Sequence, residues 1–180
     1  MGIPTLISTS TITSATSSVD ITSGIDSTYD EYMFVLTDVA PATDSQDFSF
    51  QVNGAGESGF NETITSTVFR AYHPEGGSGA DLAYDTSRDQ AQGTAYQPLS
   101  GEVGGGADES LSGILHLYSP ASTTYVKHFI WRGTVYFSED AAYSNFNAGY
   151  INTTTAIDEI SFKFASGNIA NSVIQMYGIA

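Results

Sequence analysis

The stretch Asp47-Phe48-Ser49-Phe50-Gln51-Val52-Asn53 decides the fold class of this chain. Its apolar residues alternate one by one with polar residues, and successive side chains of a β-strand point to opposite faces of a sheet. The stretch therefore predicts a strand with one apolar face and one polar face. The stretch Ile160-Ser161-Phe162-Lys163-Phe164 repeats the alternation near the C-terminus.

The same criteria place seven strands along the chain and an eighth before them. The expected ranges are 31–39, 47–53, 63–72, 111–118, 125–137, 158–164 and 171–178, with the early strand within 11–21. Residues that favour turns, mainly glycine and proline, separate these ranges. We expect an all-β fold, an antiparallel, jelly-roll-like β-sandwich of about eight strands with one long irregular loop. Gly133, inside the longest range, predicts a bulge or a bend between sheets.

A chain of 180 residues has the length of one domain. We expect a single β-sandwich domain over residues 1–180. The Ser/Thr-rich stretch 1–18 is a candidate N-terminal arm that would add a strand to a neighbour's sheet, although an ordinary edge strand is the favoured interpretation. Residues 74–107 are rich in glycine and poor in apolar residues, and are expected as a long excursion of the kind that is functional or contacts a partner.

Charge and composition exclude several classes of partner. Twenty acidic residues against 5 basic ones give a formal net charge of −15, and the pI is about 4.1. Such a chain cannot neutralise a run of phosphates, so we expect neither nucleic acid nor an anionic membrane as a partner. The absence of cysteine removes thiol chemistry and cysteine zinc sites. Short apolar runs and an opening without a signal-peptide pattern predict a soluble protein.

Glycine and histidine patterns come close to functional motifs without meeting their requirements. Residues 54–59 match G-x-G-x-x-G, but residues 60–68 predict a strand in place of the helix that a dinucleotide site needs, so a hairpin loop is favoured. The triple glycine at 104–106 lacks the lysine and hydroxyl residue of a phosphate loop. His73, His116 and His128 lack the close spacing of zinc ligands and are expected as partly exposed residues of a sheet face.

Two acidic clusters could surround a hard cation. Asp26, Asp30 and Glu31 form the first, and Asp108 with Glu109 forms the second. Neither has the spacing of an EF-hand loop, so solvated turns are favoured. No nucleophile elbow occurs in the sequence, and nothing singles out a catalytic pair of carboxylates. We therefore predict that the chain is not an enzyme, and we assign no catalytic, cofactor-binding or metal-binding residue and no cofactor.

Some aromatic residues and two asparagines fit recognition patterns by sequence alone. Trp131 beside Phe129 could stack on sugar rings, but packing in the core is the commoner fate of such residues. Asn61 and Asn152 begin glycosylation acceptor patterns, and no glycan is assigned to them.

Several phrases of the sequence carry a resemblance to a known family. They are the C-terminal stretches 157–164, Gly167-Asn168-Ile169 and Ile174-Gln175-Met176-Tyr177-Gly178-Ile179, and upstream Ser18-Val19-Asp20-Ile21, Gly24-Ile25-Asp26, Tyr29-Asp30-Glu31-Tyr32, Leu111-Ser112-Gly113 and Lys127-His128-Phe129. In these phrases the chain resembles, over nearly its whole length, virion structural proteins of tailed bacteriophages, notably marine phages and cyanophages.

The resemblance implies a β-sandwich on the exterior of a phage particle, as a capsid decoration (cement) protein or as a component of a tail or head fibre. It implies the major capsid protein or other virion proteins as partners, and no catalytic residue. Decoration is favoured, because fibre proteins of this kind often have an attachment region or a coiled stem that we do not find here. A roughly 8,400 Å² surface would carry one net negative charge per roughly 560 Å², which suits an exterior position.

The sequence also leads to expectations about the oligomeric state and about alternative functions. We expect a homo-oligomer, with a trimer favoured over a dimer, because a capsid offers threefold and twofold positions. The second function is a receptor-recognition module that binds host-surface polysaccharide. A hydrolase acting on host glycans ranks last, because no acid pair is identified.

Overall fold

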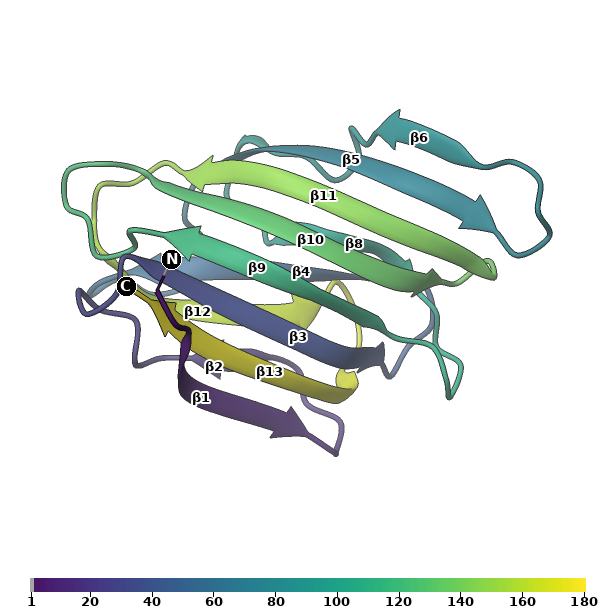
Figure 1. Ribbon diagram of the computed structural model, residues 1–180, viewed down its shortest axis with the longest axis horizontal. Helices are drawn as coiled ribbons and strands as arrows, with labels where there is room; N and C mark the ends of the chain where they lie inside the picture. Colours follow the sequence, from purple (N-terminus) through teal and green to yellow (C-terminus); the bar gives the residue numbers. More distant parts are fainter. Residues whose placement is uncertain (1) are drawn as a thin grey trace.

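The computed structural model describes residues 2–180, and all regular elements in that range are β-strands (Figure 1). The prediction of an all-β protein is therefore confirmed. The strands are β1 (Thr5–Ile12), β2 (Val19–Ile21), β3 (Glu31–Pro41), β4 (Gln46–Gly54), β5 (Ile64–Pro74), β6 (Asp81–Tyr84), β7 (Ala91–Gly93), β8 (Gln97–Val103), β9 (Leu111–Tyr118), β10 (Lys127–Phe137), β11 (Ala141–Ile151), β12 (Ile157–Phe164) and β13 (Ile169–Ile179).

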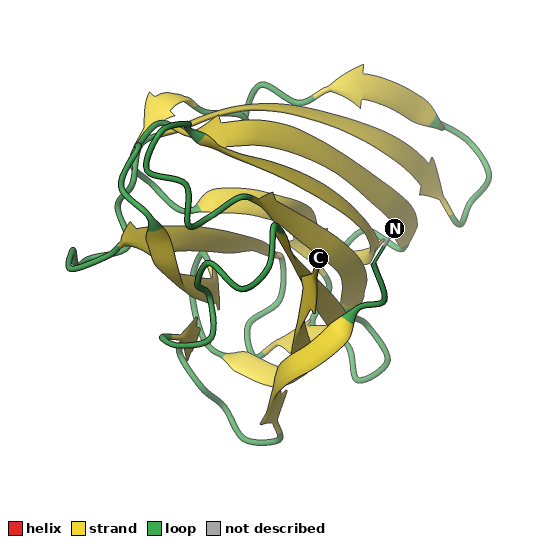
Figure 2. Ribbon diagram, turned by 60° about the vertical axis from the view of Figure 1, so that its left-hand side comes forward, coloured by secondary structure: helices red, strands yellow, loops and turns green. Residues whose placement is uncertain are grey.

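The strands form one antiparallel sheet that nearly closes into a barrel. Its main path is β1-β13-β3-β9-β10-β8-β4-β12-β2, and a branch from β10 continues through β11 to β5, which carries β6 and β7. Figure 1 shows a wide layer that runs from β1 to β5, with a narrow layer of β8, β4, β12 and β2 behind it. In Figure 2 both layers curve around one interior. The expected jelly-roll-like sandwich of about eight strands is not supported, because 13 strands share one hydrogen-bonded sheet.

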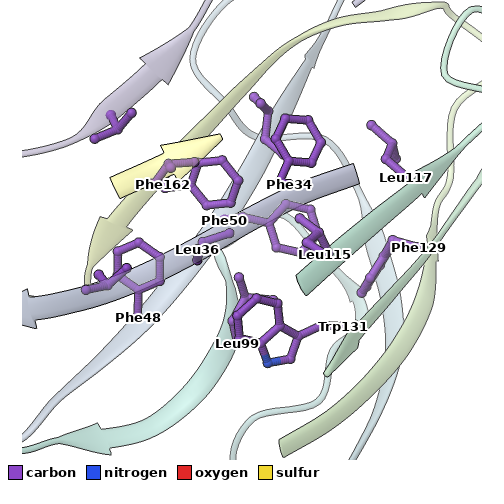
Figure 3. Packing of buried hydrophobic residues seen from close by; sticks show 14 of the residues in the cluster. Phe34, Leu36, Phe48, Phe50, Leu99, Leu115, Leu117, Phe129, Trp131 and Phe162 are labelled. Carbon is purple, nitrogen blue, oxygen red and sulfur yellow. The ribbon is translucent and has the colours of Figure 1, made fainter. Parts of the chain in front are cut away.

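The hydrophobic core lies between the two layers. Phe34 on β3 contacts Phe162 on β12 with ring centroids 5.7 Å apart, and Phe50 on β4 contacts Phe129 on β10 at 5.1 Å (Figure 3). All four side chains are fully buried, and each pair joins the wide layer to the narrow one. The apolar faces predicted for 47–53 and 160–164 are thus the faces that meet this core.

Side-chain amides complete the junction between β8 and the wide layer. β8 shares only one residue pair with β10, so most of its second edge has no strand beside it. Asn145 Oδ1 accepts a hydrogen bond from the Gly101 amide at 3.2 Å, and Asn147 Nδ2 donates to the Pro98 carbonyl at 2.6 Å. Since buried backbone groups must be paired, these two β11 side chains take the place of a neighbouring strand.

The strands expected at 31–39, 47–53, 63–72, 111–118, 125–137, 158–164 and 171–178 are confirmed as β3, β4, β5, β9, β10, β12 and β13. The range 11–21 was wrong as one strand, because β1 ends at Ile12 and β2 begins at Val19. Thr5–Ile12 pairs with β13 of its own chain, so the stretch proposed as an arm forms an edge strand. The excursion at 74–107 was wrong as an irregular loop, because β6, β7 and β8 lie within it.

β10 passes through Gly133 without any register shift, so the bulge expected there is wrong. Gly133 lies opposite Gly113 on β9, and the buried Trp131 indole occupies the space on their inner side. A Cβ added at Gly133 would lie 2.3 Å from a Trp131 ring atom, and one at Gly113 would lie 2.5 Å from the same indole. The glycine pair therefore makes room for the largest core side chain.

We expect Gly133→Ala to lower the free energy of unfolding by about 1–3 kcal/mol, because the added methyl displaces the buried Trp131 indole. Urea unfolding followed by tryptophan fluorescence measures this loss. Gly76→Ala is the control, since its Cβ meets no atom within 4 Å, and it should change stability by less than about 0.5 kcal/mol. Equal effects of the two variants would contradict the packing role of Gly133.

Candidate functional site

The wide layer turns one long face away from the core. This outer face is formed by the outward side chains of β1, β13, β3, β9, β10, β11 and β5, and Figure 1 shows these strands side by side. Burial alternates strictly along β10, where Phe129, Trp131 and Val135 are buried and Ile130 and Arg132 are exposed. The outer face is thus a continuous solvent-facing sheet surface.

Acidic residues are almost absent from the outer face. The seven strands that form it contain only two, Glu31 and Asp38, both close to the ends of β3, although the chain has 20 acids. The other 18 acids lie outside these seven strands, so the rest of the chain carries nearly all the negative charge. Depletion of charged residues is a property of the central parts of protein–protein interfaces.

A row of large side chains crosses the outer face. Ile114, Arg132, Phe146, Phe69 and Tyr84 lie directly opposite one another on β9, β10, β11, β5 and β6, and we call them the aromatic row. The Phe69 and Phe146 rings stack with centroids 4.8 Å apart and planes at 4°, and the Arg132 guanidinium carbon lies 5.3 Å from the Phe146 centroid. Phe69 is 45% exposed and Tyr84 is 53% exposed.

A shallow groove borders the aromatic row. It encloses about 320 Å³ and is lined mainly by Thr67, Phe69, Ile130, Arg132 and Phe146. The groove has apolar walls and a single cation, which is the composition of a docking surface with an apolar centre.

A buried ionic network braces the strands beneath the aromatic row. Arg88 donates to both carboxylate oxygens of Asp47 at 2.9 and 3.0 Å and to Asp85 at 2.8 Å, and the Tyr143 hydroxyl donates to Asp85 at 3.1 Å. Burial opposes ionisation of Asp85, but hydrogen bonds from Ser87 and Arg88 outweigh it and lower the Asp85 pKa to about 2. The network ties the segment after β6 to β4 and β11.

We expect Arg88→Leu to lower the free energy of unfolding by about 3–5 kcal/mol, because it leaves the buried Asp85 carboxylate and the partly buried Asp47 carboxylate without their cation. Urea unfolding at neutral pH measures the loss. Arg132→Leu removes an exposed arginine of the same size and should have a far smaller effect. Equal losses in the two variants would count against the network.

The lowered pKa of Asp85 also predicts a pH dependence. Stabilisation by its carboxylate is complete above the ordinary pKa of 3.8 and is lost as the pH falls toward about 2. The difference in unfolding free energy between the wild type and Asp85→Asn should therefore be largest near neutral pH and shrink between about pH 4 and 2. A difference that stays constant across this range would contradict the assignment.

The structure places the three histidines at separate points of the outer face. His116 hydrogen-bonds Glu31, while the ring of His128 lies 6.3 Å from that of Tyr150. His73 is exposed near the end of β5. Within residues 2–180, no group of three or more His, Cys, Asp or Glu side chains is placed to hold a metal ion.

The structure separates the members of the first acidic cluster, because Asp26 lies in a turn whereas Glu31 begins β3. Asp26 accepts hydrogen bonds from the Thr28 amide and the Tyr32 hydroxyl, and these interactions lower its pKa. Glu109 accepts a hydrogen bond from the Gly106 amide, and Asp108 is exposed in the same turn. Asp26 and Glu109 thus satisfy backbone donors of their own loops, whereas Glu31 hydrogen-bonds His116 on β9.

The glycine motif at 54–59 connects β4 to β5 and is followed by a strand, which contradicts a dinucleotide site. The expected hairpin was also wrong, because β4 and β5 lie in different layers and do not pair.

Two ionisable side chains near this loop are buried. The Glu62 carboxylate accepts a hydrogen bond from the Gly54 amide, and burial together with neighbouring Glu57 raises the Glu62 pKa. The buried Lys127 ammonium donates to the carbonyls of Thr153 and Thr155, and burial lowers its pKa.

Trp131 and Phe129 are buried in the core, which confirms the favoured interpretation of this pair. The Asn152 side chain donates a hydrogen bond to Gln92, while Asn61 is exposed.

The sequence analysis did not predict the aromatic row, because it did not predict β11, which supplies Phe146. Phe69 could have been identified as an outward-facing aromatic residue, because it points to the opposite side of its strand from the buried Val68.

Comparison with known proteins identifies no relative of this chain, so the outer face is the main evidence for its function. No protein-family model matches the chain, and no curated protein is significantly similar to it. Residues 2–180 contain no helix with the length and hydropathy needed to cross a membrane.

Proposed function

We propose that this chain is a non-enzymatic structural protein on the exterior of a tailed-bacteriophage particle, where it binds the assembled shell as a capsid decoration protein. The observation that carries the proposal is the outer face, seven adjacent strands with two acidic residues in a chain of net charge −15. The resemblance of several short segments to phage virion proteins favours an exterior location, and in this proposal the outer face is the means of attachment.

The charge distribution suits such a protein for a physical reason. Acids on the rest of the surface repel other copies and DNA, which keeps the free protein dispersed. The outer face has almost none of this charge, so docking there avoids the cost of removing ionised carboxylates from water. The major capsid protein or another virion protein is the partner in this proposal.

The attachment needs only mass action. A copy that bridges neighbouring shell subunits binds the assembled shell and not the separated subunits, and therefore stabilises the shell. The aromatic row, which includes Arg132, supplies the kind of side chains that become buried anchors and dominate interface energetics, and exposed Thr67 lies beside it.

A receptor-recognition module that binds host-surface polysaccharide is the second candidate. The parallel Phe69 and Phe146 rings next to Tyr84 favour it, because aromatic rings on an exposed sheet face can stack on sugar rings. A role as a fibre component would use the same contacts.

The proposal predicts that the purified chain co-sediments with assembled shells of its phage and not with dissociated capsid protein. Phe69→Asp should weaken binding to shells about tenfold or more, because it places a carboxylate in the docking centre. Tyr125→Asp, at a loop residue that is 73% exposed, should bind like the wild type.

Failure of the wild type to bind shells, or equal binding by Phe69→Asp, would overturn the decoration role. Saturable binding to a glycan array that is lost in Phe69→Asp, without shell binding, would establish the second candidate in its place.

A further inference from the structure

The ends of the sheet differ in how well they are protected against pairing with another chain. β2 and β7 have three residues each and β6 has four, and Asp20 and Asp81 place carboxylates on β2 and β6. Short strands and charges are common devices that prevent edge-to-edge pairing. The free edges of β2, β6 and β7 are therefore poorly suited to pairing with a strand of another chain.

β1 is the exception. It has eight residues, Thr5–Ile12, with no charged residue and no proline, and its neighbour β13 is uncharged as well. Its outward side chains are exposed, and Leu6 is 50% exposed. Among residues 2–180, only β13 makes backbone hydrogen bonds to β1, so its other edge is unpaired. A register shift between Leu6 and Ser8 interrupts the pairing with β13, which is regular from Ser8 to Ile12, so the extended part of the free edge is residues 8–12.

The charge distribution makes this edge the place where two copies of the chain repel each other least. Two copies of a chain with net charge −15 repel each other over most orientations. The repulsion is weakest where β1 and β13 form an uncharged margin at the end of the outer face. A second copy presents the same margin, and a free strand edge offers backbone donors and acceptors in the pattern that a second strand requires.

We propose that β1 pairs antiparallel with β1 of a second copy about a twofold axis, so that two wide layers become one continuous sheet. Identical edges that pair in this way form a closed dimer, and the short charged edges at the other ends stop further growth. The inference favours a dimer over the trimer expected from the sequence, and it does not rest on the proposed function.

The dimer would also extend the outer face. Thr9, Gln175 and Val35 lie in the same cross-strand row as Ile114, the first member of the aromatic row. Pairing at β1 therefore places two aromatic rows on one side of a shared sheet, separated by the uncharged strands around the axis.

Sedimentation of the full chain tests the inference. The wild type should have twice the 19.1 kDa chain mass, and Thr9→Asp/Thr11→Asp should be monomeric because it places four carboxylates at the pairing edge of a dimer. Thr37→Asp/Thr134→Asp adds the same charge to exposed outer-face threonines of β3 and β10, and should remain dimeric.

Disulfide cross-linking gives a readout that does not depend on the folding of the Asp variants. The chain has no cysteine, so Thr9→Cys, Thr11→Cys and Thr134→Cys each introduce a single thiol. Residues near the twofold axis lie opposite themselves within disulfide reach, so under mild oxidation Thr9→Cys or Thr11→Cys should form a covalent dimer and Thr134→Cys should not. A monomeric or trimeric wild type, a dimer that survives Thr9→Asp/Thr11→Asp in folded protein, or cross-linking at Thr134 alone would overturn the proposal.

Discussion

Burial of Phe34, Phe50, Phe129 and Phe162 between the two layers is the interaction on which the rest of the structure depends. Each of the two ring pairs joins a strand of the wide layer to a strand of the narrow layer, so the sheet must curve until its inner faces meet. Burial of side chains of this size supplies about 1.5–3 kcal/mol each, before the cost of ordering the chain. This contact buries the inner face of the wide layer, so only its outer face can contact another molecule.

Polar interactions complete what the aromatic core begins. Asn145 and Asn147 pair backbone groups of β8 that have no strand beside them, and the Asp47–Arg88–Asp85 network anchors the segment between β6 and β7. A buried polar group that loses such a partner is costly, so these contacts favour one arrangement of the strands over its alternatives. With these strands held in place, Phe69 and Phe146 lie in register on the outer face.

Sequence patterns predicted the strands whose inner faces are apolar, and failed where polar residues point inward. β11 directs Asn145 and Asn147 into the interior, and β8 directs Gln97 and Ser100 there, so neither strand alternates between apolar and polar residues. The near-closure of the barrel depends on these same polar contacts, which alternation cannot reveal. Within the candidate site, the sequence alone could identify Phe69 as an outward-facing aromatic residue. Its pairing with Phe146, and the near absence of acids around the two rings, become apparent only when the order of the strands is known.

A cryo-electron microscopy reconstruction of the phage particle tests the central claim most directly. If the outer face is the docking surface, density for this chain lies on the exterior of the shell, with the Phe69–Phe146 side of β5, β11 and β10 against capsid subunits. Density at the tail tip, or a shell contact made by the acidic surface while the outer face stays in solvent, would contradict it.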